Sequence, residues 1–198
     1  MAIGVVLVAA IAAILAVAVF GGAADSRPDG LAFNGQELPT YVAGVADPAV
    51  GQKAPIFTTE YLDGDYAFIG GGGGPNDTAK LVLFVAHWCP TCQAEVPTIA
   101  GWVADNELPD GVEIVIVSTF ADADRDNYPP ADWFDAAGWS APVVADSTDG
   151  EIAAQFGFSS VPAWTVLTNL NVVLDRGVGP LPENDLERLV NLAATSRG

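Results

Sequence analysis

The feature that most constrains the fold is an uninterrupted apolar stretch, residues 81–86, that leads directly into His-Trp-Cys-Pro-Thr-Cys at residues 87–92. A continuous apolar run of this length predicts a β-strand buried on both faces. The residues that follow carry apolar side chains at helical spacing, which predicts a helix over residues 90–104, with a kink at Pro97. A buried strand that passes into a helix is typical of an α/β sheet.

The remainder of the chain continues this alternation. Alternating apolar positions around the turn dipeptide Asp63-Gly64 predict a short hairpin over residues 57–69. Further apolar and helical patterns predict strands at 112–119 and 142–145, helices at 132–137 and 151–156, an antiparallel pair at 163–168 and 171–175, and a closing helix marked by Leu186, Leu189, Val190 and Ala193. We therefore expect one α/β domain with a central sheet.

The N-terminus is apolar enough to cross a membrane. Residues 1–24 contain no charged side chain, and about 20 helical residues span a hydrocarbon core of about 30 Å. A secretory signal with a cleavage site at residues 22–24 is the alternative, but its apolar core is usually shorter and follows a basic start. The sequence thus predicts a retained transmembrane anchor at 1–24, a Gly-, Pro- and Asp-rich linker at 25–50 and a folded domain at 51–198.

Charge restricts the location and the partners. The chain has 7 Lys and Arg against 25 Asp and Glu, a net charge of -18, which disfavours nucleic acid as a partner. Asp25 and Asp29 outnumber Arg27 next to the apolar segment, and this weak acidic bias favours a domain on the extracytoplasmic side of the cell membrane. Cysteines in such compartments are usually paired.

Cys89 and Cys92 are the only cysteines, and their spacing points to redox chemistry. At the start of a helix, one turn separates them and brings the two sulfurs within bonding reach. Pro90 suits the first helical position, and the free N–H groups of the helix start favour a thiolate on Cys89. Cys89 is therefore the expected nucleophile, and Cys92 is the expected resolving thiol of a redox-active disulfide.

Other uses of this motif fit less well. A structural zinc site needs four ligands, and the chain offers two cysteines and a single histidine, His87. Covalent haem attachment requires a histidine directly after Cys92, where Gln93 stands. A purely structural disulfide across so short a loop adds little stability. We expect neither a metal nor a cofactor.

The motif also carries a family resemblance. Residues 88–97, Trp-Cys-Pro-Thr-Cys-Gln-Ala-Glu-Val-Pro, resemble the Trp-Cys-x-x-Cys-x-x-Glu-x-Pro signature of the TlpA/ResA-type membrane-anchored thioredoxin-like proteins. The likeness extends from residues 51–57 to residues 178–179. It implies a thioredoxin-like fold, a central mixed sheet flanked by helices, with an N-terminal hairpin and with an inserted helix and strand within residues 121–158.

The resemblance implies roles for further residues. It predicts a cis peptide bond between Val161 and Pro162, packed beside the cysteines. In such folds the backbone at the position of Val161 pairs with an extended substrate segment. Trp88 would belong to the same contact surface, although an aromatic side chain there is equally consistent with packing alone.

One departure from ordinary thioredoxins concerns proton transfer. Those proteins carry a buried acid six residues before the first cysteine, where this chain has Leu83. Glu95 matches the signature glutamate and lies one helical turn beyond Cys92, so it is the candidate proton acceptor. The alternative is a solvated helix carboxylate. His87 is a weaker candidate for tuning the thiolate.

These observations predict a thiol-disulfide oxidoreductase that acts on protein thiols and disulfides outside the cytoplasmic membrane, most simply as a reductant, and that exchanges electrons with a membrane electron donor or acceptor. The direction of electron flow rests on the resemblance alone. Two other functions stay open. A copper-binding maturation protein would require a wider cysteine spacing and a distant histidine, and a peroxiredoxin-type peroxidase normally carries a threonine where this chain has Ala86.

Overall fold

The computed structural model describes residues 27–72, 74 and 77–196. Within these residues no helix is both long and apolar enough to cross a membrane. The apolar segment 1–24, which the sequence predicts to be a transmembrane anchor, lies outside the described part of the chain. The anchor therefore remains a prediction.

The centre of the fold is a mixed five-stranded sheet with the strand order β6-β5-β4-β7-β8. Strands β4 (Ala79–Val85), β5 (Val112–Ser118) and β6 (Val143–Ala145) are parallel, whereas β7 (Ala163–Leu167) and β8 (Val173–Val178) add to β4 in antiparallel fashion. Every residue of β4 is buried, as expected for a central strand covered on both faces.

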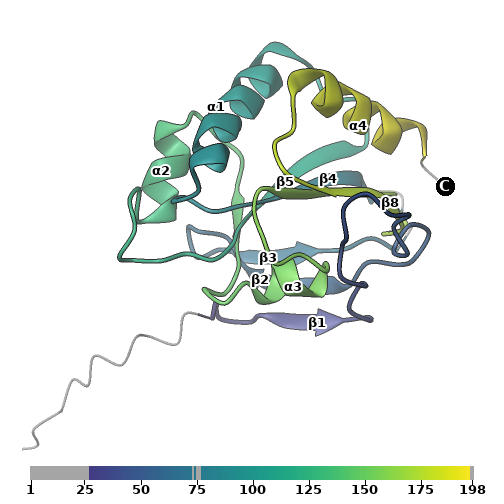
Figure 1. The fold of residues 1–198 in the computed structure, drawn as a ribbon, viewed down its shortest axis with the longest axis horizontal. Coiled ribbons are helices and arrows are strands. Elements are labelled where there is room, and N and C mark those ends of the chain that lie inside the picture. Colours follow the sequence, from purple (N-terminus) through teal and green to yellow (C-terminus); the bar gives the residue numbers. More distant parts are fainter. Residues whose placement is uncertain (1–26, 73, 75–76, 197–198) are drawn as a thin grey trace, which may run out of the picture.

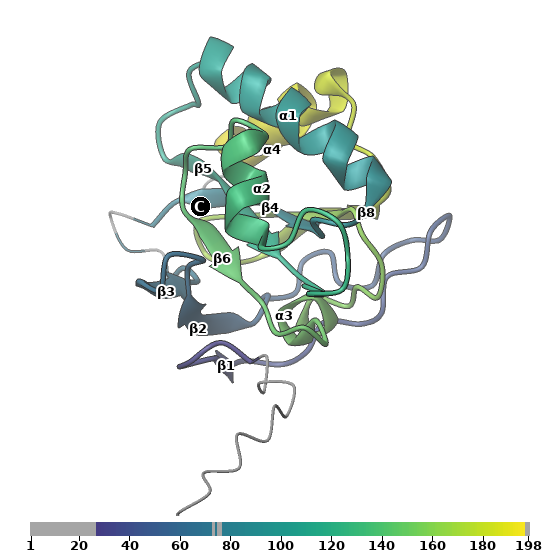
Figure 2. The same cartoon turned by 90° about the vertical axis from the view of Figure 1, so that its left-hand side faces the viewer.

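Two layers cover this sheet. Helices α1 (Pro90–Asp105), α2 (Pro130–Ala136) and α4 (Glu183–Thr195) lie on one face, and α3 (Glu151–Gln155) lies on the other together with a small antiparallel sheet (Figures 1 and 2). The small sheet consists of β1 (Ala32–Asn34), β2 (Ile56–Glu60) and β3 (Tyr66–Ile69). Alternate residues of β4 enter two separate cores: Leu81 and Leu83 pack under the helices, and Val82 and Phe84 pack toward α3.

The predicted elements are confirmed, with differences of a few residues at their ends. The hairpin around Asp63-Gly64 is β2–β3, and the inserted helix and strand are α2 and β6. The fold is therefore the thioredoxin-like α/β arrangement that the resemblance implies. Pro97 lies inside α1 on its exposed side, where the hydrogen bond that it cannot donate is least costly.

The segment before Gly51 differs from its prediction. The sequence predicts a linker at 25–50, but the structure shows β1 paired with β2 and buries Leu31, Leu38 and Ala49 against the domain. The low apolar content of the segment misled the prediction. A few apolar side chains are enough to hold the segment in place once they pack against the surface of the folded domain. The described part of the domain begins well before residue 51.

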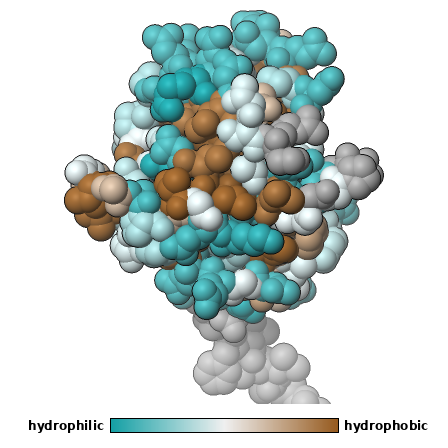
Figure 3. All heavy atoms as spheres, turned by 90° about the vertical axis from the view of Figure 1, so that its right-hand side faces the viewer, coloured by the Kyte–Doolittle hydropathy of each residue, from teal (hydrophilic) through white to brown (hydrophobic). Residues whose placement is uncertain are grey.

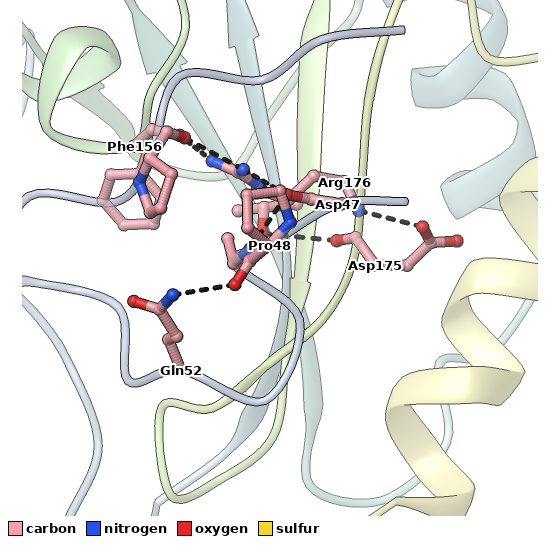
Figure 4. A network of polar contacts seen from close by, with 9 residues as sticks. Asp47, Pro48, Gln52, Phe156, Asp175 and Arg176 are labelled. Carbon is pink, nitrogen blue, oxygen red and sulfur yellow. Dashed lines mark hydrogen bonds and ion pairs between the residues drawn. The ribbon is translucent and has the colours of Figure 1, made fainter. Parts of the chain in front are cut away.

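A buried ion pair fixes this segment. Arg176 of β8 has a fully buried side chain that pairs with both carboxylate oxygens of Asp47 and donates to the carbonyl oxygens of Phe156 and Pro39 (Figure 4). The guanidinium group holds the pKa of Asp47 below its usual value. Arg176 thus connects the N-terminal segment, α3 and the central sheet.

The outer surface of this region is partly apolar. Viewed from the right-hand side of Figure 1, apolar side chains gather between polar regions above and below (Figure 3). In the segment that Arg176 holds, the side chains of Val42, Val45 and Val50 are at least half exposed.

Candidate active site

The two cysteines lie where α1 leaves the carboxyl end of β4. Cys89 is the N-cap residue of α1, and its Sγ accepts a hydrogen bond from the backbone N–H of Cys92 at 3.3 Å. Pro90 occupies the first helical position, as predicted. Both cysteines are free thiols in this structure. The local sequence thus folds as expected because a helix start without a side-chain hydroxyl still needs a capping acceptor, and the sulfur supplies it.

The two thiols differ in their surroundings. Cys89 retains 6% of its surface exposed at the edge of the groove described below, whereas Cys92 is fully buried among Leu83, Val96 and other residues of the core. Burial raises the pKa of the Cys92 thiol, and the side-chain hydrogen bond that Cys92 makes with Cys89 and the nearby charge of Glu95 act in the same direction. Cys92 is therefore held as a protonated thiol until another group removes its proton.

Glu95 is buried, which argues against a solvated helix carboxylate. Only 8% of the residue is exposed, and its Oε1 accepts a hydrogen bond from the backbone N–H of Leu181. Burial raises its pKa to about 7, against the weaker opposing effect of that hydrogen bond. No salt bridge joins Glu95 to a basic side chain among the described residues. A carboxyl group that titrates near neutrality one helical turn from Cys92 can take up and return a proton.

Val161 and Pro162 lie beside the cysteines, as the resemblance implies. Their peptide bond is cis, and the Cys89 thiol donates to the carbonyl oxygen of Val161 across 3.8 Å. Leu83 stands where ordinary thioredoxins carry a buried acid, and it lies in the same core as Cys92. That position therefore provides no acid for Cys92. The loop before β7 and the start of α1 are thereby brought together although 72 residues separate Cys89 from Val161.

Trp88 forms one wall of a groove next to Cys89. The groove has a volume of about 360 Å³ and is lined by Trp88, Cys89, Phe120, Ser159, Ser160 and Val161. The indole N–H of Trp88 donates to the carbonyl oxygen of Phe120 at 2.7 Å, and its ring stays partly exposed. Trp88 therefore fits both interpretations of its role, because the side chain is anchored by packing and also belongs to the surface that faces the groove.

Sequence reasoning missed Phe120 and Arg125 at this site. Phe120 adopts a positive φ of 52°, and its ring lies so close to Gly150 that a Cβ there would meet it at 2.1 Å. The Arg125 guanidinium lies over the Trp88 ring, 4.9 Å from its centroid. No motif marks either residue, because both lie in the irregular segment that follows β5. Gly150 is the one local signal, since its φ of 73° favours glycine.

The described residues contain no cluster of three or more His, Cys, Asp and Glu side chains that could hold a metal ion. His87 is buried, and both of its ring nitrogens contact the backbone of the loop after β5. The ring nitrogens of His87 are thus engaged by the backbone and do not share a metal site with the sulfurs of Cys89 and Cys92.

Comparison with known proteins agrees with this geometry. Residues 49–192 match the model of the Redoxin family. The chain belongs to the Redoxin family. It is 28% identical over 168 residues to the thiol:disulfide interchange protein HelX of Rhodobacter capsulatus, covering 80% of this chain and 82% of HelX. It is 25% identical over 142 residues to the thioredoxin-like protein YneN of Bacillus subtilis, covering 72% and 79% of the two chains.

Solved structures show the same fold. StoA of Bacillus subtilis superposes with a TM-score of 0.56 at 22% identity, covering 72% of this chain and 98% of StoA. Together with the family match, these similarities identify this Redoxin family member as a thioredoxin-like thiol-disulfide oxidoreductase of the TlpA/ResA type.

Proposed function

We propose that this oxidoreductase reduces disulfides of protein partners on the extracytoplasmic side of the cell membrane, to which residues 1–24 tether it. The observation that carries the proposal is the pairing of two unlike thiols at one helix start. Cys89 borders an open groove and accepts the Cys92 N–H, whereas Cys92 is buried directly behind it. Such an arrangement separates the attacking thiol from the resolving thiol.

The proposed reaction has two steps. The Cys89 thiolate attacks one sulfur of a partner disulfide, forms a mixed disulfide and releases the first partner thiolate. Cys92 then transfers its proton to Glu95 and attacks the Cys89 sulfur, which releases the second partner thiolate. The partner gains two electrons, and Cys89 and Cys92 are left as a disulfide. A membrane electron donor of the dithiol class would return both cysteines to thiols.

Partner binding would use the groove beside Cys89. We propose that an extended partner segment lies along Val161 and Pro162 and contacts the exposed face of Trp88. Backbone pairing of this kind accepts many sequences, which suits a protein that acts on several partners. Similarity to an interchange protein, HelX, supports protein disulfides as the substrate class.

Trapping of partners tests the assignment of the two thiols. In a Cys92→Ser variant, Cys89 can attack but nothing resolves the adduct, so mixed disulfides should accumulate and should be visible on non-reducing gels. A Cys89→Ser variant is the matched control and should trap almost nothing. If the Cys89→Ser variant is the better trap, the roles are reversed. If neither variant traps a partner and both retain the wild-type function, the pair is a structural disulfide.

The location and the direction have separate tests. A reporter that is active only outside the cytoplasm, fused after residue 196, should be active, and the purified protein should retain residues 1–24. Activity of a cytoplasmic reporter alone would place the domain on the other side. The Cys89–Cys92 reduction potential tests the direction: a value of about -270 mV supports reduction, and about -120 mV supports oxidation.

A further inference from the structure

His87 is the buried ionisable group that the reaction above does not use. It follows β4, two residues before Cys89, and is fully buried. Its Nδ1 lies 2.7 Å from the carbonyl oxygen of Asp126, and its Nε2 accepts the backbone N–H of Asp122 at 3.1 Å. A carbonyl oxygen only accepts and a backbone N–H only donates, so Nδ1 donates to Asp126 and Nε2 accepts from Asp122.

This arrangement leaves His87 no part in proton transfer. Both nitrogens are engaged by the backbone of residues 121–128, here called the inserted loop, and neither is free to exchange a proton with Cys89. The role of His87 therefore lies in what it holds. Its own carbonyl oxygen accepts from Asn127 of the loop at 3.3 Å and from Gln93 of α1 at 2.8 Å, and its ring contacts Tyr128.

The inserted loop in turn fixes one wall of the groove. Arg125 of the loop lies over the Trp88 ring, and Phe120, directly before the loop, accepts the indole N–H of Trp88. The facing wall, Val161 with Ser159 and Ser160, belongs to the segment before β7. The separation of the two walls thus depends on where the inserted loop is held, and residues 122–129 are otherwise exposed.

We propose that His87 is a positioning residue that holds the inserted loop and thereby sets the width of the groove in which a partner segment binds next to Cys89. The proposal rests on the proposed function and names its substrate class more closely. Trp88, Phe120 and Val161 give the groove apolar surface beside Ser159 and Ser160, so the occupant is an extended peptide with an apolar side chain beside its cysteine. His87 acts on partner binding rather than on thiol chemistry.

Steady-state kinetics with two probes separate these effects. The first probe is a disulfide-linked peptide of about ten residues with leucine beside the cysteine, which fills the groove. The second is bis(2-hydroxyethyl) disulfide, which is too small to contact both walls. The variant His87→Phe keeps a ring and removes both hydrogen bonds, whereas His87→Gln retains one donor and one acceptor.

The expected result is a change in KM. For His87→Phe, KM for the peptide should rise about tenfold, as expected from the loss of two hydrogen bonds that hold the loop, while kcat changes less than about twofold. The ratio of kcat/KM for the peptide to that for the small disulfide should fall by a similar factor. His87→Gln should recover most of this loss. A fall in kcat with unchanged KM, or equal losses for both probes, would overturn the proposal.

A surface variant covers the case in which His87→Phe does not fold. Arg125 is exposed, and Arg125→Gln removes only its contact with the Trp88 ring. Peptide KM should then rise about two- to threefold, and an unchanged KM would count against the role of the loop. If the wild-type protein reduces neither probe, the proposed function itself fails, and that outcome is distinct from any change in the ratio.

Discussion

Two carboxylates with little solvent exposure have opposite surroundings in this protein. Asp47 faces the fully buried guanidinium of Arg176, which lowers the pKa of the carboxyl group, whereas Glu95 has one backbone N–H as its partner, and burial raises its pKa to about 7. In the first region, Arg176 compensates the charge of Asp47, and the ion pair fixes the local structure. The second leaves the charge uncompensated and gains a group whose protonation changes near neutral pH.

A third carboxylate, which is buried, shows that backbone hydrogen bonds alone do not offset desolvation. Asp146 accepts hydrogen bonds from the backbone N–H groups of Ser147, Ile152 and Ala153 and so caps α3. Its pKa is nevertheless raised, because desolvation outweighs these bonds. The difference between Asp47 and Glu95 thus comes mainly from the presence or absence of a facing positive charge.

The largest expected effect concerns the compensated pair. Arg176→Met leaves the partly buried Asp47 without its cation, and the carbonyl oxygens of Phe156 and Pro39 lose their donor. The free energy of unfolding should fall by about 3–5 kcal/mol. Urea denaturation at pH 7 measures this change. A double variant with Asp47→Asn should recover part of the loss, and a loss below about 1 kcal/mol would show that the pair contributes little.

The next effect concerns the rate of resolution. Glu95→Gln keeps an acceptor for the Leu181 N–H but cannot take the Cys92 proton. Resolution of the mixed disulfide should slow by about a hundredfold, and its rise with pH around 7 should disappear. Single-turnover measurements between pH 5 and 9 check both. A variant that keeps the wild-type rate and pH profile would return Glu95 to a structural role.

The same variant has a smaller effect on stability, and this effect depends on pH. A carboxyl whose pKa is raised in the folded state, here from 4.5 to about 7, contributes stability below pH 4.5 that is lost as the pH rises through 7. Glu95→Gln should therefore match the wild type near pH 4 and exceed its unfolding free energy by about 1–2 kcal/mol at pH 8, after allowance for partial solvent access. If the difference in unfolding free energy between the variant and the wild type is the same at both pH values, the raised pKa is contradicted.

The smallest effect provides the contrast for Arg176. Arg188 pairs with Asp175 of β8 and Asp185 of α4, but about half of its side chain is exposed. Arg188→Met should change the free energy of unfolding by less than about 1 kcal/mol. Thermal or urea unfolding of the Arg188→Met and Arg176→Met variants side by side gives the comparison. If the two arginine variants lose equal stability, burial is not what distinguishes the pairs.

Much of the fold and part of the site follow from local sequence patterns. The apolar run before the cysteines defined a central strand, the Cys-Pro-Thr-Cys motif defined a helix start, and the Glu95 position followed from helical spacing. Each of these inferences concerns neighbours within a few turns of the chain, where backbone geometry alone fixes the relative positions. The cis bond before Pro162 was implied by family resemblance and not by composition.

Tertiary structure decided what depends on contacts between distant residues. Whether Glu95 is solvated or buried, whether residues 27–50 are a linker or part of the domain, and which loop faces Trp88 all depend on surfaces brought together by the sheet. The packing of Phe120 against Gly150 and the pair Asp47–Arg176 join residues far apart in sequence. The sequence by itself determined which groups can react, and the packed structure decided their solvation and their neighbours, because burial and charge compensation are properties of the assembled core and not of the local chain.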